Sequence, residues 1–133
     1  MSPIPAQRIE NGVLAVAILV AFFVTDAGWW WPLVAFLAFD LSALGYLAGP
    51  KVGAAAYNVV HSYIAPAGLV IAGLVLAALG SGDLAQGGWA FFVAGLWAFH
   101  VAADRALGYG LKLVDGFTHT HLGRIGKDRH VAS

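Results

Sequence analysis

The last apolar stretch of the chain, residues 88–112, carries His100, Asp104 and Arg105 within it. Ionisable residues inside a membrane-crossing segment are rare and by default indicate a functional site. His100 and Asp104 are four residues apart, so on a helix they lie one above the other on the same face. An imidazole and a carboxylate placed in this way can share a proton or hold a metal ion. The spacing therefore predicts a buried polar site inside a membrane protein.

The earlier apolar segments carry polar groups as well. Asp40 lies late in the second segment, and Tyr57, Asn58 and His61 lie early in the third. On a helix, Tyr57 and Asn58 precede His61 by four and three residues, so all three share one face. Glu10 begins the first segment, where it could stabilise the helix N-terminus or serve as a metal ligand. Each apolar segment thus contributes at least one polar group.

The composition is that of an integral membrane protein. Of the 133 residues, 60% are hydrophobic and only 11% are charged. The mean hydropathy is +0.79, which is too apolar for a soluble domain of this length. The zero net charge argues against a nucleic-acid partner, and the absence of cysteine excludes disulfides and cysteine-ligated zinc. We expect membrane lipid and a lipophilic small molecule as partners.

Four membrane-spanning helices can be placed along the chain, since about 20 apolar residues cross the hydrocarbon core. They are expected at residues 10–25, 31–47, 53–79 and 89–109. Pro66 should kink the third helix, because proline lacks a backbone donor. The predicted fold class is all-α: one transmembrane domain over residues 1–133, with a four-helix bundle in up-down-up-down order and a polar tail at 112–133.

The basic residues predict the orientation of these helices. They gather at one end of the layout: Arg8, Lys51, Lys112 and the basic residues of the tail. The loops at the other end carry only Asp26 and Asp83. The positive-inside rule then places both termini in the cytoplasm, and we expect a multi-pass protein of the cytoplasmic (inner) membrane. No convincing cleavage site follows the first apolar segment, so we expect a retained helix and not a secretory signal.

Threading the chain up and down brings the polar residues together in the cytoplasmic half of the bundle. Four residues are predicted to be catalytic: Asp40, His61, His100 and Asp104. Their two imidazoles and two carboxylates could also form an N₂O₂ shell for a divalent metal, with Glu10 as a further candidate ligand. The residues expected to bind substrate surround them: Tyr57, Asn58, Arg105, Tyr109 and Lys112. The two cations among these suit an anionic headgroup.

Several short motifs contain these residues: Arg8-x-Glu10, Asp40-Leu-Ser-x-Leu-Gly-Tyr46, Tyr57-Asn58-x-x-His61, His100-x-x-x-Asp104-Arg105-x-x-Gly-Tyr-Gly-Leu-Lys112 and Gly116-Phe-x-x-Thr-His121-Leu-Gly. With them the chain resembles, over nearly its whole length, a family of small bacterial integral membrane proteins, the domain of unknown function 4260. The resemblance implies a single four-span domain and supports grouping these residues. It implies no activity.

Three classes of function fit these residues. An enzyme acting on a lipophilic substrate would use them for hydrolysis, isomerisation or cyclisation, by acid–base or metal-assisted chemistry. A small proton-coupled transporter would use them to link flux to protons, as a homo-oligomer because four short helices enclose little volume. A non-catalytic scaffold would use them only to fix helix packing. We favour the enzyme, in which Asp104 orients His100, and His100 or Asp40 moves the proton.

Overall fold

The structure is a computed structural model that describes residues 3–80 and 88–126. Its helices in chain order are α1 (Pro3–Val24), α2 (Trp31–Val34), α3 (Phe36–Asp40), the 3₁₀ helix η1 (Leu41–Ala48), α4 (Pro50–Val60), α5 (Ile64–Leu79) and α6 (Gly88–Leu107). After α6, the strands β1 (His119–Thr120) and β2 (Gly123–Arg124) form an antiparallel hairpin. The predicted all-α class is confirmed, and this hairpin is the only sheet in the described part of the chain.

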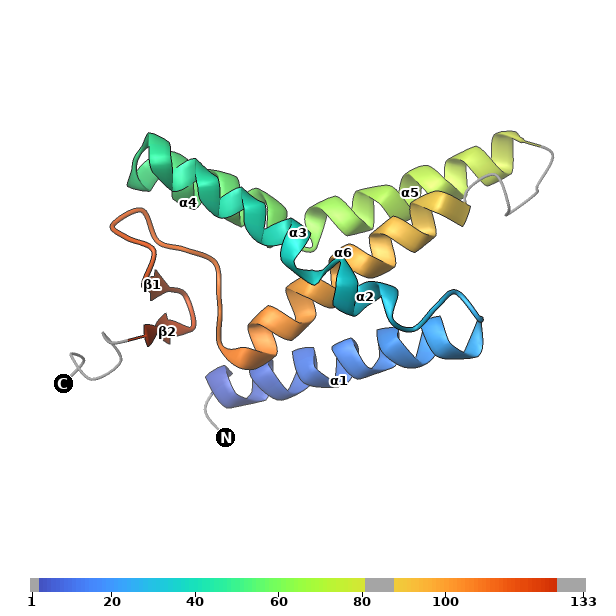
Figure 1. The fold of residues 1–133 in the computed structure, drawn as a ribbon, viewed down its shortest axis with the longest axis horizontal. Coiled ribbons are helices and arrows are strands. Elements are labelled where there is room, and N and C mark those ends of the chain that lie inside the picture. Colours follow the sequence, from blue (N-terminus) through green and yellow to red (C-terminus); the bar gives the residue numbers. More distant parts are fainter. Residues whose placement is uncertain (1–2, 81–87, 127–133) are drawn as a thin grey trace.

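Four helical spans are long and apolar enough to cross a membrane: Pro3–Val24, Trp31–Ala48, Pro50–Leu79 and Gly88–Leu107. The second joins α2, α3 and η1, and the third joins α4 and α5. Successive spans run in opposite directions, as the up-down-up-down order predicts (Figure 1). The chain is therefore a multi-pass membrane protein. Its first span begins earlier than predicted, because Pro3 and Pro5 are tolerated in the first turn of a helix.

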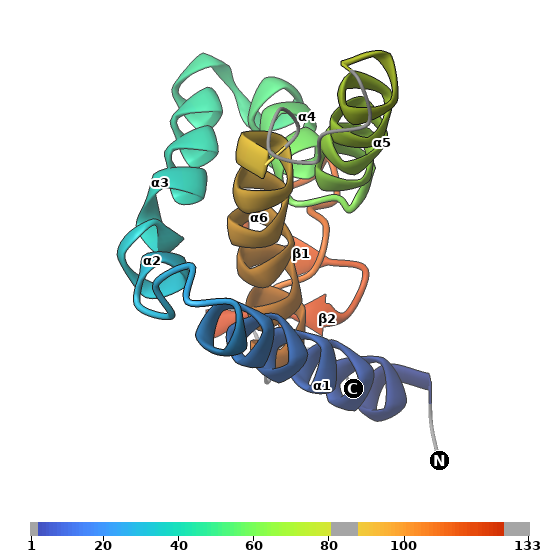
Figure 2. The same ribbon diagram turned by 90° about the vertical axis from the view of Figure 1, so that its right-hand side faces the viewer.

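The helix α6 is the one against which most others pack. α1 and α5 lie along it, and α2 and α3 also contact it, as the two views show (Figures 1 and 2). Phe99 and Ala102 of α6 form the core with Ala15 of α1. Large apolar side chains of α1, such as Val13 and Phe23, are instead exposed. An outward apolar surface of this kind is expected of helices that face lipid.

The second span is not one regular helix. α2 and α3 are separated at Ala35, and directly after Asp40 the chain tightens into the eight-residue 3₁₀ helix η1. Runs of 3₁₀ helix longer than three or four residues are uncommon. η1 packs closely on α4, since a Cβ at Gly53 would lie 2.2 Å from the ring of Tyr46. A residue without a side chain is required at this contact, which holds the second span against the third.

The third span is interrupted at its histidine. α4 ends at Val60, His61 has φ −94° and ψ 20°, and α5 begins at Ile64. The sequence predicts a kink at Pro66, and the interruption lies about one turn before it. The reason is that a proline ring collides with the carbonyl four residues earlier, here that of Ser62. Pro66 itself lies in the first turn of α5, where its missing donor costs nothing.

The segment after α6 folds back toward α4. α6 ends in a Schellman turn at Gly108, whose φ of +99° favours glycine. Asn58 of α4 then binds both backbone groups of Lys112, accepting from its N–H at 2.6 Å and donating to its carbonyl at 2.8 Å. The predicted polar tail is thus attached to the third span where it begins, at Lys112. Asp83 and residues 127–133 lie outside the described residues.

Candidate metal and substrate site

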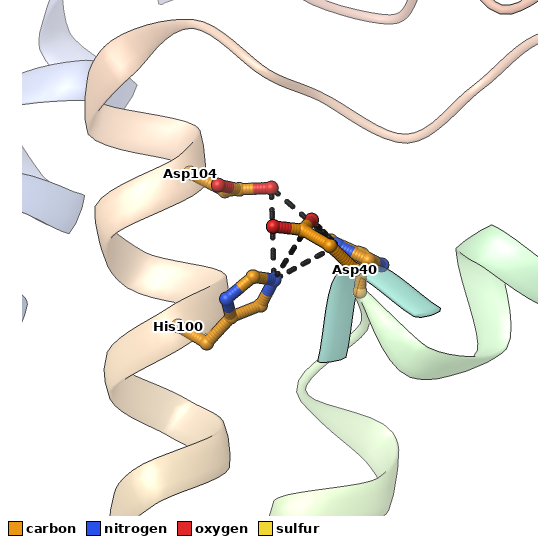
Figure 3. A group of neighbouring side chains, drawn as sticks. Asp40, His100 and Asp104 are labelled. Atoms are coloured by element: carbon orange, nitrogen blue, oxygen red, sulfur yellow. Dashed lines mark hydrogen bonds and ion pairs between the residues drawn. The ribbon is translucent and has the colours of Figure 1, made fainter. Parts of the chain in front are cut away.

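Four side chains from three spans converge on one point, as Figure 3 shows for Asp40, His100 and Asp104. His100 and Asp104 come from α6, Asp40 ends α3, and His61 follows α4. One nitrogen or carboxylate oxygen of each lies within 4.8 Å of the others. We name these four residues the His–Asp cluster. The structure therefore brings together all four residues that the sequence predicts to be catalytic.

The distances between the imidazoles and the carboxylates of the His–Asp cluster are close to those of a metal shell. Nε2 of His61 lies 2.9 Å from Nε2 of His100. The same atom of His61 lies 3.5 Å from a carboxylate oxygen of Asp40 and 3.5 Å from one of Asp104, and the matching distances from His100 are 3.7 and 3.8 Å. In a tetrahedral zinc site with bonds of about 2.0–2.2 Å, neighbouring ligand atoms are roughly 3.3–3.6 Å apart. The residues present therefore fit a divalent metal.

Tyr57 orients two members of the cluster. Its backbone carbonyl lies 2.9 Å from Nδ1 of His61. A carbonyl only accepts, so this hydrogen bond assigns the proton to Nδ1 and directs the Nε2 lone pair into the cluster. The Tyr57 ring stacks on the His61 ring at 3.6 Å and 7°, and its hydroxyl donates to Oδ2 of Asp104 at 3.1 Å. One residue thus holds both an imidazole and a carboxylate in place.

The four cluster members differ in their access to the outside. His100 is completely buried, His61 is 3% exposed and Asp104 is 6% exposed. The His100 ring packs against Phe36 and Phe39, at centroid distances of 4.5 and 5.2 Å. Asp40 is different, because its side chain is 42% exposed. Polar groups buried as deeply as those of His61, His100 and Asp104 are expected to be paired or to coordinate a metal.

A cavity of about 360 Å³ opens beside the cluster. Its lining residues are Phe36, Asp40, Ala43, Tyr57, Asp104, Leu107, Tyr109 and Phe117. The walls are mainly apolar and include two carboxylates, which is the usual character of a small-molecule site. Another cavity, of about 410 Å³, lies between α1 and α6 and has no ionisable lining residue. The cavity at the cluster therefore combines space with chemistry.

Lys112 is buried close to this cavity, with 3% of its surface exposed. Its Nζ lies 3.9 Å from the centre of the Phe117 ring and 4.7 Å from that of Tyr57. Among the described residues, this Nζ has no hydrogen-bond acceptor. Burial lowers the pKa of the ammonium to about 8, while the carboxylates of Asp104 and Asp40 act in the opposite direction. The site thus holds a cation on aromatic faces beside two carboxylates.

Three other predicted site residues lie elsewhere. The Arg105 guanidinium lies over the Tyr63 ring at 4.6 Å and donates to the His61 carbonyl at 3.4 Å, so it does not line the cavity. The side chain of Asn58 forms its hydrogen bonds with the backbone of Lys112. Glu10 is exposed on α1 and is not part of the cluster. Tyr109, by contrast, lines the cavity.

Two aromatic residues of the cavity, Phe36 and Phe117, are not among the site residues predicted from the sequence. Phe36 precedes Asp40 by four residues, which on a helix puts both on one face. Phe117 lies in the Gly116-Phe motif of the tail, far along the chain from the polar residues that it covers. Helical spacing could have found Phe36. Only the return of the tail to α4 reveals Phe117.

Comparisons with known proteins bear on the whole chain. No match is found among curated proteins or among solved structures. The family model of the domain of unknown function (DUF4260) matches residues 5–125, a range that contains the His–Asp cluster, the cavity and Lys112. This match confirms the resemblance carried by the short motifs. The chain belongs to the family of the domain of unknown function (DUF4260).

Proposed function

We propose that this protein is a membrane-embedded, metal-dependent enzyme that hydrolyses a lipophilic substrate at the His–Asp cluster. One observation carries the proposal: two imidazole nitrogens and two carboxylate oxygens from three spans meet within 4.8 Å. Ligands drawn from separate segments of a chain converge in this way only if folding places them. Proton-coupled transport and a purely structural role would use the same residues, but they predict different experimental results.

A cation at the centre explains the direction of the lone pairs. His61 has its proton on Nδ1, so its Nε2 faces Nε2 of His100 at 2.9 Å with a lone pair. Ionised Asp40 and Asp104 are acceptors only, and they point at the same nitrogens. Without a metal, Nε2 of His100 would donate its proton to Nε2 of His61. If that proton is removed, four electron-rich atoms meet in the interior and repel one another unless a cation lies between them. A divalent ion held by these four residues would neutralise both carboxylates and accept both imidazole lone pairs.

The donor set favours zinc or a similar transition metal. Imidazole nitrogen suits zinc, iron and copper, whereas magnesium and calcium prefer shells made of oxygen only. Two nitrogens and two oxygens, with imidazole–carboxylate distances of 3.5–3.8 Å, fit zinc best. When bound, such an ion lowers the pKa of a coordinated water and polarises a carbonyl or phosphoryl oxygen.

The residues around the cluster have distinct parts in this mechanism. Asp40 lines the cavity and its side chain is 42% exposed, so we assign it as the ligand that would give up its place to the attacking water and accept a proton from that water. Tyr57 holds Asp104 and His61 in position through its hydroxyl and its carbonyl. Phe36 and Phe39 exclude water from the far side of His100. The apolar walls of the cavity would receive the lipophilic part of the substrate.

We also propose that the site opens toward the cytoplasm, in a protein of the cytoplasmic membrane. The positive-inside rule is the basis of this proposal. Lys51 begins the third span, and Lys112 and Arg124 follow the fourth. The start of α1, the start of α4 and the C-terminal hairpin lie at the same end of the molecule, which supports a single basic face (Figure 1).

Metal content measured by mass spectrometry tests the metal site. We expect about one zinc ion per chain in detergent-purified protein, and its loss in the His61→Ala, His100→Ala double variant. His119→Ala is the matched control, because His119 lies in the tail and pairs with Asp115. Size-exclusion chromatography and tryptophan fluorescence establish that each variant is folded. Equal metal content in the double variant and the control would refute the site.

A second experiment separates the enzyme from its alternatives. Zinc-loaded protein is incubated with a bacterial lipid extract, and the products are followed by mass spectrometry. We expect new hydrolysis products with the native chain and none with Asp40→Asn, provided that this variant keeps its metal. Proton-linked flux in vesicles without product formation would favour a transporter. A structural scaffold would be favoured if the native chain forms no product and carries no proton-linked flux, and the His100→Ala variant only fails to fold.

A further inference from the structure

We propose that Lys112 binds the acidic group of the substrate, so that the substrate is an amphipathic anion: a lipophilic carboxylate or phosphate ester. This inference rests on the proposed function, because it concerns the molecule on which the His–Asp cluster acts. Its starting point is a buried ammonium, 3% exposed, whose Nζ has no acceptor among the residues that the structure describes. The two aromatic rings that contact this ammonium, Tyr57 and Phe117, both line the cavity.

Contacts with distant residues set the backbone position of Lys112. Asn58 binds its N–H and its carbonyl, and Thr120 pairs with it across a β-bridge. These contacts fix the backbone at Lys112, whose side chain is buried. An ammonium has three donors, and burying it without acceptors is unfavourable. Cation–π contacts with Tyr57 and Phe117 offset only part of this cost. A group that accepts hydrogen bonds and carries negative charge would complete the site.

The charges of the loaded site leave room for one anion. Asp40 and Asp104 together carry two negative charges, which one divalent ion neutralises. Lys112 then has no counter-charge of its own. The other nearby cation, Arg105, is turned toward the Tyr63 ring and the His61 carbonyl. A single acidic group beside Lys112 restores neutrality in a region where uncompensated charge is costly. Metal loading should therefore strengthen the binding of an anion.

The cavity indicates what is attached to the acidic group. Apart from the carboxylates and two tyrosines, its lining consists of Phe36, Ala43, Leu107 and Phe117, which suit hydrocarbon. The spans that form it are apolar on their outer surfaces, so a chain longer than the cavity could extend into the lipid. A small hydrophilic anion would bind the ammonium but leave the apolar walls in contact with water. An amphipathic anion would contact both the ammonium and the apolar walls.

Native mass spectrometry of zinc-loaded, delipidated protein tests the inference, because one spectrum reports metal and ligand together. The probes are oleate, methyl oleate and inorganic phosphate, offered to the native chain, Lys112→Met and Lys112→Arg. The matched control is Lys51→Met, which removes an exposed lysine at the start of α4. We expect the native chain to bind oleate about tenfold to a hundredfold more tightly than methyl oleate. Lys112→Met should lose this preference, Lys112→Arg should keep most of it, and Lys51→Met should behave as the native chain does.

The outcomes separate this inference from the proposed function. Equal binding of oleate by the native chain and a folded Lys112→Met variant overturns the inference, even when zinc is present in both. Phosphate bound as well as oleate would also overturn it, because the site would then recognise a free anion and not an amphiphile. Loss of the oleate preference in Lys112→Met without any zinc in the native chain would support the anion site and refute the metal centre.

Discussion

The His–Asp cluster is supplied by two kinds of helix. α6 is continuous from Gly88 to Leu107 and presents His100 and Asp104 from adjacent turns. The second and third spans are broken, and their ligands lie at the breaks: Asp40 before η1 and His61 between α4 and α5. On α6 the distance between the two ligands follows from the helix itself. At the breaks it depends on how each segment packs against its neighbours.

This difference teaches how a small membrane protein can build a four-ligand site. A regular helix offers ligands along a line at fixed spacing, so it can supply one edge of a tetrahedron but not the whole of it. Broken helices bring backbone and side chains to the centre from other directions. In membranes, such interruptions are tolerated where they are buried in protein or line a cavity. The breaks at Asp40 and His61 meet that condition.

The largest expected effect is a difference in zinc affinity between variants of the two carboxylates, Asp104 and Asp40. We expect Asp104→Asn, on α6, to weaken zinc binding more than about a hundredfold, beyond the effect typical of groups that only orient ligands. Asp40→Asn should weaken it about tenfold, because Asp40 is half exposed and water can take its place. Competition with a chromophoric chelator measures both. Equal losses would show that the continuous and broken spans hold the metal in the same way.

The next effect tests the residue that links α4 to α6. Tyr57→Phe keeps the ring that stacks on His61 but removes the donor to Asp104. We expect zinc affinity to fall about tenfold, as for other groups that orient a metal ligand. Tyr63→Phe is the matched control, since its hydroxyl bonds to Asn11 away from the cluster. No change in Tyr57→Phe would mean that Asp104 needs no support from the broken span.

A smaller effect should follow from loosening the second span from the third. In Gly53→Ala the new methyl group would meet the Tyr46 ring, so we expect the free energy of unfolding to fall by about 1–3 kcal/mol. Gly68→Ala has open space around it and should change stability by less than about 1 kcal/mol. Unfolding titrations in mixed micelles measure both. Equal stability of the two variants would show that the contact between η1 and α4 does not hold the broken spans together.

The smallest effect concerns pH, through the segment that follows α6. Since Lys112 has a pKa of about 8 instead of 10.5, its ammonium loses its proton as the pH rises through 8. The charged groups acting on it are Asp104 and Asp40. We expect oleate binding to decline severalfold between pH 7 and pH 9 in the native chain, whereas Lys112→Met should bind equally weakly at both.

The same shift gives stability a defined sign. Below pH 8 both the folded and the unfolded chain carry the proton on Lys112, and the folded state bears the full cost of the buried charge. Between pH 8 and 10.5 the folded state is deprotonated first, so this contribution raises stability as the pH increases. The rise should be absent from Lys112→Met. A native profile that falls over this range would contradict the assignment.

The periodic parts of the molecule could be predicted from the sequence. The four apolar segments are long enough to be found by composition, and the pairing of His100 with Asp104 follows from helical spacing. The membership of Asp40 and His61 in the same site was also predictable, because alternating spans bring the same end of each helix together. These inferences depend on local geometry and on chain direction only.

The roles of Asn58 and Arg105 could not be predicted in the same way. Both are polar residues in apolar segments, and the sequence alone does not distinguish their roles from that of Lys112. The structure separates them: Asn58 fixes the backbone of Lys112, Arg105 contacts Tyr63, and Lys112 lies beside the cavity. Which way a side chain faces on a broken helix or a returning tail depends on contacts between distant residues.

The sequence by itself determined the class, the four spans, their alternating direction and the four residues of the cluster. Apolar length and helical periodicity are local properties, which any helix in a membrane must express. Only the tertiary structure decided where the second and third spans break, that the tail returns to α4, and that Lys112 is buried beside Phe117. These features depend on close packing, such as that of Gly53 on Tyr46, and on hydrogen bonds between residues more than fifty positions apart.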